Sequence, residues 1–261
     1  MKKNKYVSVS HEQNLIELYK VGKELRLGDL SQILTECEKD AEFINLPGER
    51  QVFYILMSVV ERRLALRNER ILKKTGVMNP CIDIRHVQVG SNGLSRELLQ
   101  NLRSYSWAQP QTGRWICITG ASGVGKTGLV QSLIKEAAGN GIASKYMLFS
   151  DLAHQIESHL REGTMQNFRN ELRKSTILGI DDVGMGDYPI NVLVEFKTIM
   201  DDRQIGKGLI LSSQLPPPEW FPGLKRKELS DAICDRALAV SHIHIRLKGN
   251  SMRTTNPVTT E

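Results

Sequence analysis

The chain has 261 residues, of which 40% are hydrophobic, and a formal charge of +6. This length suits one α/β domain with a small accessory domain, and the positive charge is compatible with nucleic acid as a partner. We expect a cytoplasmic protein, because there is no apolar run of membrane-span length and no secretory signal after Met1–Lys5. The four cysteines are isolated and lack metal-ligand spacing, so we expect reduced thiols.

A small all-α domain is predicted over residues 1–76. Apolar residues recur at helical intervals between residues 11 and 39, which predicts two short amphipathic helices. A long helix is then expected over residues 49–74, and Gly76 ends it.

The second half of this long helix carries a basic stripe. Arg63, Arg67 and Arg70 lie on one helical face because their spacing is four and three residues. Such a stripe can follow DNA phosphates. The alternative is a solvated face that pairs with Glu61 and Glu69.

A connecting segment follows over residues 77–112, with a helix near 95–103. After it come a core domain over 113–250 and a polar tail over 251–261. Within the core, strands and helices alternate, which predicts a three-layer α/β/α fold with a parallel five-stranded sheet. The expected strands are 114–119, 143–149, 177–181, 208–213 and 240–247. The expected helices are 126–139, 150–161, 165–174, 190–203 and 228–238.

A complete phosphate-binding loop follows the first of these strands. Its residues, with the next one, form the predicted nucleotide site: Gly120, Ala121, Ser122, Gly123, Val124, Gly125, Lys126, Thr127 and Gly128. The glycines let consecutive N–H groups face a phosphate, and the following helix adds its dipole. Lys126 can reach the β- and γ-phosphates, and the Thr127 hydroxyl can ligate Mg²⁺. ATP and Mg²⁺ are the predicted cofactors.

Two carboxylates end the third strand. Asp181 is placed to hold Mg²⁺, and Asp182 to orient or deprotonate the attacking water. One further strand separates the two motifs along the chain, which is typical of the additional-strand P-loop NTPases, including AAA+ proteins. The alternative is that both aspartates simply begin a turn.

Polar residues follow the fourth strand, where AAA+ proteins carry the sensor for the γ-phosphate. Gln214 is the first candidate for this sensor and Ser213 the second. Gln214 can instead simply cap the strand.

Arg236 lies on a short helix far along the chain from the phosphate loop. In AAA+ assemblies an arginine at this place reaches the γ-phosphate of the neighbouring subunit. The alternative is an internal ion pair with Asp231 or Asp235.

From about Leu27 to Arg253 the chain resembles the IstB-type transposition helper ATPases of bacterial insertion sequences. Besides the phosphate loop, the resemblance rests on these segments: Pro47–Arg50, Ile180–Gly184, Asp201–Arg203, Ser213–Pro216, Asp231–Arg236 and Lys248–Arg253. DnaC-type helicase loaders share the ATPase core, but the terminal segment and the region of Trp220 favour the IstB type.

The resemblance implies an AAA+ ATPase that binds ATP at subunit interfaces and oligomerises on double-stranded DNA. Such proteins deform the DNA and present it to an IstA-type transposase, which stimulates a slow hydrolysis. Asp182 stands where many AAA+ proteins have Glu. The chain after residue 247 is too short for the usual helical lid, which leaves Arg253 as a speculative substitute for the lid arginine.

The basic residues of the helical segment after the second strand are candidates for DNA contact, because related initiator ATPases carry nucleic-acid-binding insertions there. They are Arg161, Arg169, Arg173 and Lys174. Further basic candidates are Lys145, Lys225, Arg226 and Lys227. For each of them, the alternative is solvated surface.

Three alternatives to the transposition ATPase remain. A helicase loader would bind a replicative helicase, and a metabolite kinase would transfer phosphate to a small molecule without DNA. A non-hydrolysing module would bind ATP and DNA but never release phosphate.

Overall fold

The computed structural model describes residues 16, 20, 22, 30–90, 92–204, 206–221, 227–239 and 242–251. The chain divides into two units, residues 1–70 and 71–261. The division lies inside a long helix, and the three domain boundaries suggested by the sequence stay predictions. In the described part of the chain, no helix is both long enough and apolar enough to cross a membrane.

The first unit contains helices α2 (Leu30–Cys37) and α3 (Ala41–Ile44) and most of α4 (Gly48–Thr75). The Asp40 side chain caps α3 by accepting hydrogen bonds from the backbone of Glu42 and Phe43. The long helix was predicted to within one residue at each end. Much of the region predicted as helix between residues 11 and 29 lies outside the described residues.

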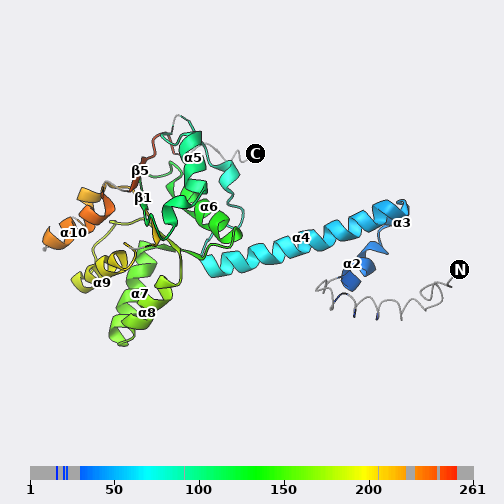
Figure 1. Ribbon diagram of the computed structural model, residues 1–261, viewed down its shortest axis with the longest axis horizontal. Coiled ribbons are helices and arrows are strands. Elements are labelled where there is room, and N and C mark those ends of the chain that lie inside the picture. Colours follow the sequence, from blue (N-terminus) through cyan, green and yellow to red (C-terminus); the bar gives the residue numbers. More distant parts are fainter. Residues whose placement is uncertain are drawn as a thin grey trace, which may run out of the picture. The chain divides into compact units, whose positions relative to one another are not determined.

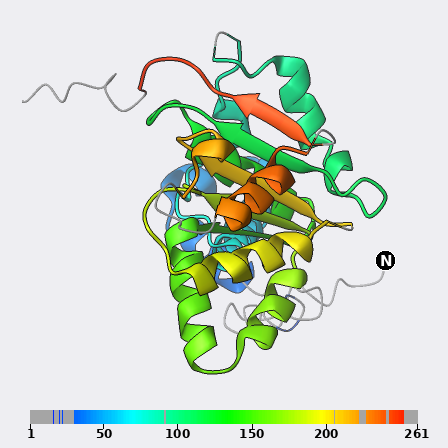
Figure 2. The same ribbon diagram turned by 90° about the vertical axis from the view of Figure 1, so that its left-hand side faces the viewer.

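A parallel five-stranded sheet forms the centre of the second unit (Figures 1 and 2). Its strands are β1 (Trp115–Thr119), β2 (Ser144–Leu148), β3 (Ile177–Asp181), β4 (Gly208–Ser213) and β5 (Ile243–Arg246), in the spatial order β2-β3-β4-β1-β5. Strand β4 therefore lies between β1, which leads into the phosphate loop, and β3, which ends in Asp181. This sheet confirms the predicted α/β fold.

Helices cover both faces of the sheet, so the three central strands β1, β3 and β4 are buried along almost their whole length. On one face lie α5 (Arg96–Arg103), α6 (Lys126–Gly139) and the short 3-10 helices η1 (Ile84–His86) and η2 (Ser106–Ala108). On the other lie α7 (Phe149–Arg161), α8 (Met165–Arg173), α9 (Ile190–Asp201) and α10 (Lys227–Ala237), preceded by the 3-10 helix η3 (Pro217–Glu219). Figure 2 shows α9 and α10 across the near face of the sheet.

Arg203 ties several of these elements together from inside the core. Its side chain is 1% exposed, and its guanidinium donates to the carbonyl oxygens of Leu172, Ser175, Thr176 and Gly208 at 2.8–3.2 Å. These carbonyls belong to the end of α8, to the two residues just before β3 and to the start of β4. Burial lowers the pKa of Arg203 to about 10, so the side chain keeps its charge at neutral pH.

We expect Arg203→Met to destabilise the fold by about 3–5 kcal/mol, because it leaves several buried carbonyl oxygens without a donor. Urea unfolding followed by circular dichroism measures this change. Arg246→Met, at an exposed position of β5, is the matched control and should leave the midpoint unchanged. Equal midpoints for the two variants would contradict a structural role for Arg203.

Candidate nucleotide site

The phosphate loop joins β1 to α6 and has the backbone shape that its glycines predict. Gly123 has φ +81° and Gly125 has φ +97°, a left-handed region that side chains disfavour. Gly125 is also the residue that precedes the first turn of α6. The N-terminus of that helix therefore adjoins a loop whose backbone conformation suits an anion.

Lys126 folds back across this loop. Its side chain is 6% exposed, and Nζ donates to the carbonyl oxygens of Gly120 at 2.9 Å and Ala121 at 2.8 Å. A phosphate is a stronger acceptor than a neutral carbonyl, because a charge-assisted hydrogen bond is about twice as strong. The ammonium group is thus held at the loop, where a bound phosphate can compete for it.

Asp181 is fully buried at the end of β3 and accepts three hydrogen bonds. The Tyr146 hydroxyl donates to Oδ2 at 3.0 Å, the Ser212 hydroxyl donates to Oδ1, and the Asp182 backbone N–H donates to Oδ1 at 3.1 Å. The next residue, Asp182, has φ +55°, an unusual conformation outside glycine and one that recurs at functional sites. Asp181 is therefore fully buried and held by its neighbours, whereas Asp182 is only half-buried.

The oxygen atoms available as ligands at this site fit Mg²⁺. Mg²⁺ prefers oxygen ligands and commonly takes one or two carboxylates together with substrate phosphates. Asp181 provides a carboxylate, and Thr127 provides a hydroxyl in the first turn of α6. Among the described residues, no group of three or more His, Cys, Asp or Glu side chains could hold a metal by itself. A metal here would need the nucleotide phosphates as further ligands.

Sequence reasoning missed two side chains of this site, Ser212 and Tyr146. In β4, alternation puts Ser212 on the face that α6 covers, with Asp181, whereas Ser213 faces the other way. The Ser213 hydroxyl donates to the carbonyl of Val183 at 2.6 Å and accepts the N–H of Leu215 at 3.1 Å. Strand alternation was the signal that could have found Ser212. Of the two sensor candidates, Gln214 is half-buried just beyond the strand and stays the better proposal.

Arg236 makes an internal ion pair, but with a different partner from those that the sequence suggested. Its Nε donates to Oδ1 of Asp201 at the end of α9, and Nη1 donates to the carbonyl of Ala232 at 2.7 Å. Partial burial favours the neutral form of Asp201, but hydrogen bonds from Arg236 and Lys197 outweigh it and lower the pKa of this carboxyl. A contact of Arg236 with a neighbouring subunit would therefore compete with Asp201 for the same guanidinium.

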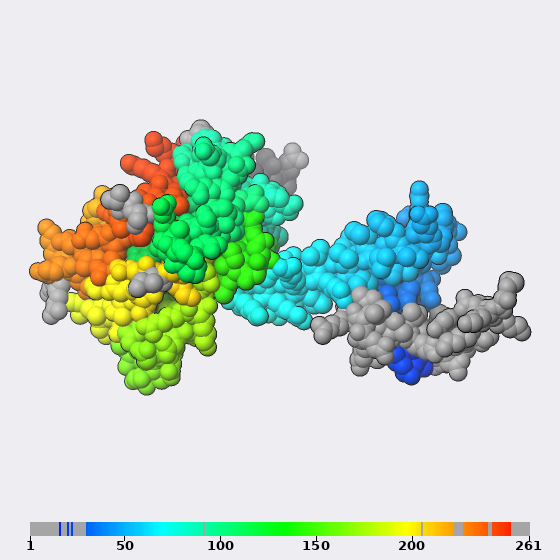
Figure 3. All heavy atoms as spheres, viewed as in Figure 1, coloured from blue at the N-terminus to red at the C-terminus, as the bar shows by residue number. Residues whose placement is uncertain are grey.

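The basic residues in β2 and in the helices after it that are candidates for DNA contact separate into two groups. Three of them make ion pairs: Lys145 with Glu171, Arg169 with Glu195 and Arg173 with Asp202. Arg161 and Lys174 make no ion pair with any described residue. The hairpin of α7 and α8 that carries most of these residues lies on the surface beside α9 (Figure 3). Of this group, Arg161 and Lys174 are therefore the more available candidates for a contact with DNA phosphates.

The other basic candidates lie elsewhere in the chain. Arg63, Arg67 and Arg70 are exposed on α4. Lys227 begins α10. Lys225, Arg226 and Arg253 lie outside the described residues.

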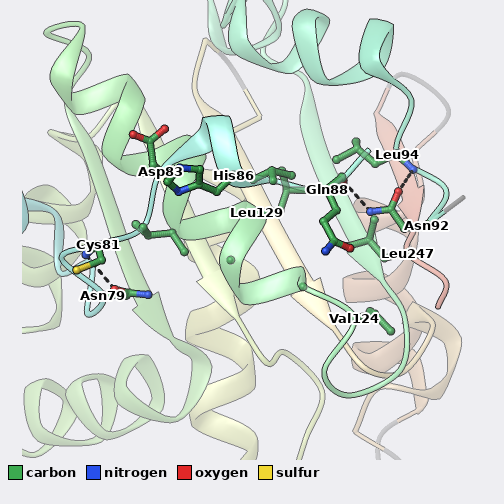
Figure 4. Close-up of a pocket in the computed structure, with 14 residues that line it drawn as sticks. Asn79, Cys81, Asp83, His86, Gln88, Asn92, Leu94, Val124, Leu129 and Leu247 are labelled. Carbon is green, nitrogen blue, oxygen red and sulfur yellow. Dashed lines mark hydrogen bonds between the residues drawn. The ribbon is translucent and has the colours of Figure 1, made fainter. Parts of the chain in front are cut away.

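A cavity of about 210 Å³ adjoins the phosphate loop (Figure 4). Three separate segments form it: the chain before α5, the start of α6 with its loop, and the residue after β5. Its apolar lining is Ile82, Val87, Leu94, Val124, Leu129 and Leu247, and its polar lining includes Asn79, Asp83, His86, Gln88 and Asn92. An apolar cavity with a few polar groups beside a phosphate loop suits the base and ribose of a nucleotide.

We expect Gly128→Leu to fill this cavity and to weaken ATP binding by at least ~10-fold, about 1.4 kcal/mol. The change leaves the phosphate loop itself intact, so competition by inorganic tripolyphosphate should not change. Gly128→Ala is the matched control, because its Cβ would make only ordinary contact, 3.8 Å from Ile82 Cδ1. Displacement of a fluorescent nucleotide measures the affinity of the protein for ATP and for tripolyphosphate. Equal losses for ATP and tripolyphosphate would contradict a base pocket here.

The chain after β5 passes beside the phosphate loop. The Leu247 N–H donates to the carbonyl of Thr119 at 2.8 Å. Ser251 lies so close to the loop that a Cβ added at Gly123 would be 3.0 Å from its Cα. Residues 247–251, the last ones described, contain no helix.

Comparison with known proteins agrees with this geometry. A sequence model of the family of IstB-like ATP binding proteins matches residues 21–259. The chain belongs to the IstB-like ATP-binding family. Its IstB-like relatives include the insertion sequence IS1162 putative ATP-binding protein of Pseudomonas fluorescens, which is 26% identical over 74% of this chain and 83% of that one. The putative insertion sequence protein y4pL of Sinorhizobium fredii is 26% identical over 85% and 88%.

Solved structures place this IstB-like chain in the AAA+ P-loop fold. DnaI has a TM-score of 0.56 at 17% identity and is matched over 64% of this chain and 92% of its own. The DnaC helicase loader has a TM-score of 0.51 at 18% identity, over 64% and 97%. AMPPCP-bound DnaA from Aquifex aeolicus has a TM-score of 0.54 at 25% identity, over 67% of this chain but only 53% of DnaA. The likeness to DnaI and DnaC is one of fold alone.

Proposed function

We propose that this protein is an ATPase that assembles on double-stranded DNA and presents that DNA to a transposase during transposition. The observation that carries the proposal is the family match over residues 21–259, together with an intact phosphate loop inside it. Relatives in the family are named as ATP-binding proteins of insertion sequences. We also propose the cytoplasm as its location.

In this proposal the nucleotide bridges two protomers. The loop N–H groups and Lys126 bind the phosphates, and the cavity beside Gly128 takes the base. Thr127 and Asp181 would hold Mg²⁺, which neutralises charge on the phosphates when bound. Asp182 orients and deprotonates the attacking water, Gln214 reads the γ-phosphate, and Arg236 of the neighbouring protomer stabilises the charge that develops during hydrolysis.

Surface features support the proposed macromolecular partners. Exposed or partly exposed cations on α4 and at the end of the α7–α8 hairpin can contact DNA phosphates without reading sequence. Helix α4 also exposes Phe53, Leu56 and Val60, which are spaced three and four residues apart along one side. An exposed apolar stripe of this kind suits a protein partner.

Electron microscopy of the protein on long duplex DNA, with and without ATP, tests the proposal. We expect ordered oligomers only when both ATP and DNA are present, and phosphate release that rises when the element's transposase is added. Cosedimentation with a replicative helicase, without any ATP-dependent coating of DNA, would instead favour a helicase loader. A protein that coats DNA but never releases phosphate would be a binding module.

A further inference from the structure

Tyr146 lies in β2, the neighbour of β3, and its hydroxyl reaches the buried carboxylate of Asp181. The tyrosine side chain is 3% exposed, and its hydroxyl is 3.0 Å from Asp181 Oδ2. In the register of the two strands, Met147 pairs with Ile180 and Leu148 with Asp181. Tyr146 therefore lies two residues before Leu148, the residue that pairs with Asp181. Its side chain extends along the sheet to reach the carboxylate.

The hydrogen bonds to Asp181 leave a defined part of the carboxylate free. A carboxylate offers about four lone-pair positions, two on each oxygen. Oδ1 accepts from the Ser212 hydroxyl and from the Asp182 N–H, whereas Oδ2 accepts from Tyr146. One position on Oδ2 is left by these three bonds. Tyr146 from β2 and Ser212 from β4 thus hold the carboxylate from both sides and set its rotation. Tyr146 bonds to Oδ2, the oxygen that has one acceptor position left.

Tyr146 is itself held in place as a hydrogen-bond donor. Besides its bond to Asp181, the hydroxyl makes a hydrogen bond with Gln131. Gln131 comes from α6, the helix that begins at the phosphate loop, and its Oε1 accepts the N–H of Asn79 at 3.2 Å. On the outer side, Gly76 approaches so closely that a Cβ there would be 2.6 Å from the Tyr146 carbonyl oxygen. The backbone of Tyr146 is thus packed closely against Gly76, while its hydroxyl is bonded to Asp181 and Gln131.

We infer that Tyr146 is a positioning residue for metal binding: its hydroxyl orients the Asp181 carboxylate so that the free position on Oδ2 faces the metal of a bound nucleotide. This inference rests on the proposed function, because it takes Asp181 as a Mg²⁺ ligand. The physical reason is general. Carboxylates that ligate metals are themselves held by hydrogen bonds, and loss of such an outer partner typically weakens metal affinity or activity by about 10–100-fold.

The test uses the full-length protein with Mn²⁺ as a spectroscopic substitute for Mg²⁺ and a non-hydrolysable ATP analogue. Electron paramagnetic resonance measures the dissociation constant of Mn²⁺ from the complex. We expect Tyr146→Phe, which keeps the ring and removes the hydroxyl, to raise this constant by at least ~10-fold. Affinity for the metal-free nucleotide should stay within a few-fold, because the phosphate loop is unchanged.

Tyr105→Phe is the matched control. Tyr105 is also buried, and its hydroxyl donates to the carbonyl of Leu133 at 3.0 Å and to Glu136 at 2.9 Å, far along α6 from the phosphate loop. Its loss removes a comparable buried hydroxyl without touching Asp181, so Mn²⁺ affinity should match the wild type. An equal weakening in both phenylalanine variants would overturn the inference, because it would reflect loosening of the fold.

Asp181→Asn separates this inference from the proposed function. If Asp181→Asn loses Mn²⁺ but Tyr146→Phe binds it as tightly as the wild type, the positioning role is wrong and the metal role of Asp181 stands. If Asp181→Asn also binds Mn²⁺ normally, the metal role itself fails. Should Tyr146→Phe not fold, Gln131→Leu leaves the tyrosine in place and removes one of its partners. A weakening of Mn²⁺ binding in that variant supports the inference, and unchanged binding overturns it.

Discussion

Replacing Lys126 by alanine is expected to weaken ATP binding by at least ~100-fold and to abolish ATP-dependent assembly on DNA. The ammonium group is buried at the phosphate loop, held by the carbonyl oxygens of Gly120 and Ala121. A bound triphosphate gives it a charged acceptor in the same place. Without it, the phosphate charge is opposed only by backbone dipoles and the metal. Isothermal titration with ATP and electron microscopy on duplex DNA measure the two effects.

Lys135→Ala is the matched control for this variant. Lys135 lies two and a half turns further along the same helix and also donates to two carbonyl oxygens, those of Pro80 at 2.7 Å and Ile82 at 2.9 Å. Its removal likewise costs one positive charge and two hydrogen bonds to backbone carbonyl oxygens. ATP binding by this control should stay within a few-fold of the wild type. Normal assembly of Lys126→Ala on DNA would refute ATP as the assembly switch.

Replacing Arg236 by alanine is expected to lower the rate of ATP hydrolysis by about 10³-fold and to leave ATP binding within a few-fold of the wild type. The reason is that a finger arginine stabilises charge in the transition state and contacts the nucleotide only from the neighbouring subunit. Phosphate release in the presence of DNA measures the first quantity, and titration of the isolated protein measures the second.

Asp201→Asn tests whether Arg236 acts through its internal ion pair. This variant removes the charge of the partner but keeps the arginine. A partly exposed pair contributes little to stability, so the variant should fold and hydrolyse ATP at a rate near that of the wild type. Equal loss of hydrolysis in Asp201→Asn and Arg236→Ala would assign the arginine a structural role.

Mixing two inactive variants shows which subunit supplies the arginine. Arg236→Ala keeps its own phosphate loop, and Lys126→Ala keeps its own arginine. In a shared site the two together restore one complete pocket at some interfaces, so part of the hydrolysis should return. No recovery on mixing, with co-assembly verified by electron microscopy, would place the arginine's action within its own chain.

The fold could be predicted from the sequence almost completely. The predicted strand over residues 177–181 matches β3, and the helix over 126–139 matches α6. This success has a local cause. A run of apolar β-branched residues, a glycine turn and an amphipathic run each determine their own backbone geometry, and the connection rules for parallel strands leave few ways to arrange them.

The partners of the site residues were less predictable. Sequence reasoning offered Asp231 or Asp235 for Arg236, because they are close along the chain, but the structure pairs it with Asp201, 35 residues away. Likewise, nothing in the run Ser144–Leu148 indicates that Tyr146 will reach Asp181. Such contacts depend on strand register and on which faces two elements turn toward each other, and these arise only when the sheet is complete.

The sequence by itself determined that this protein holds a phosphate, where the loop lies and which strand delivers the carboxylates. Each of these follows from residue types at fixed local spacing. Only glycine adopts the loop conformation easily, and the carboxyl ends of parallel strands lie together where such sheets bind ligands. The tertiary structure alone decided what surrounds them. It formed the cavity beside Gly128 from three distant segments, oriented Asp181 with Tyr146 and Ser212, and held Arg236 against Asp201. These are long-range contacts, and packing rather than local preference selects them.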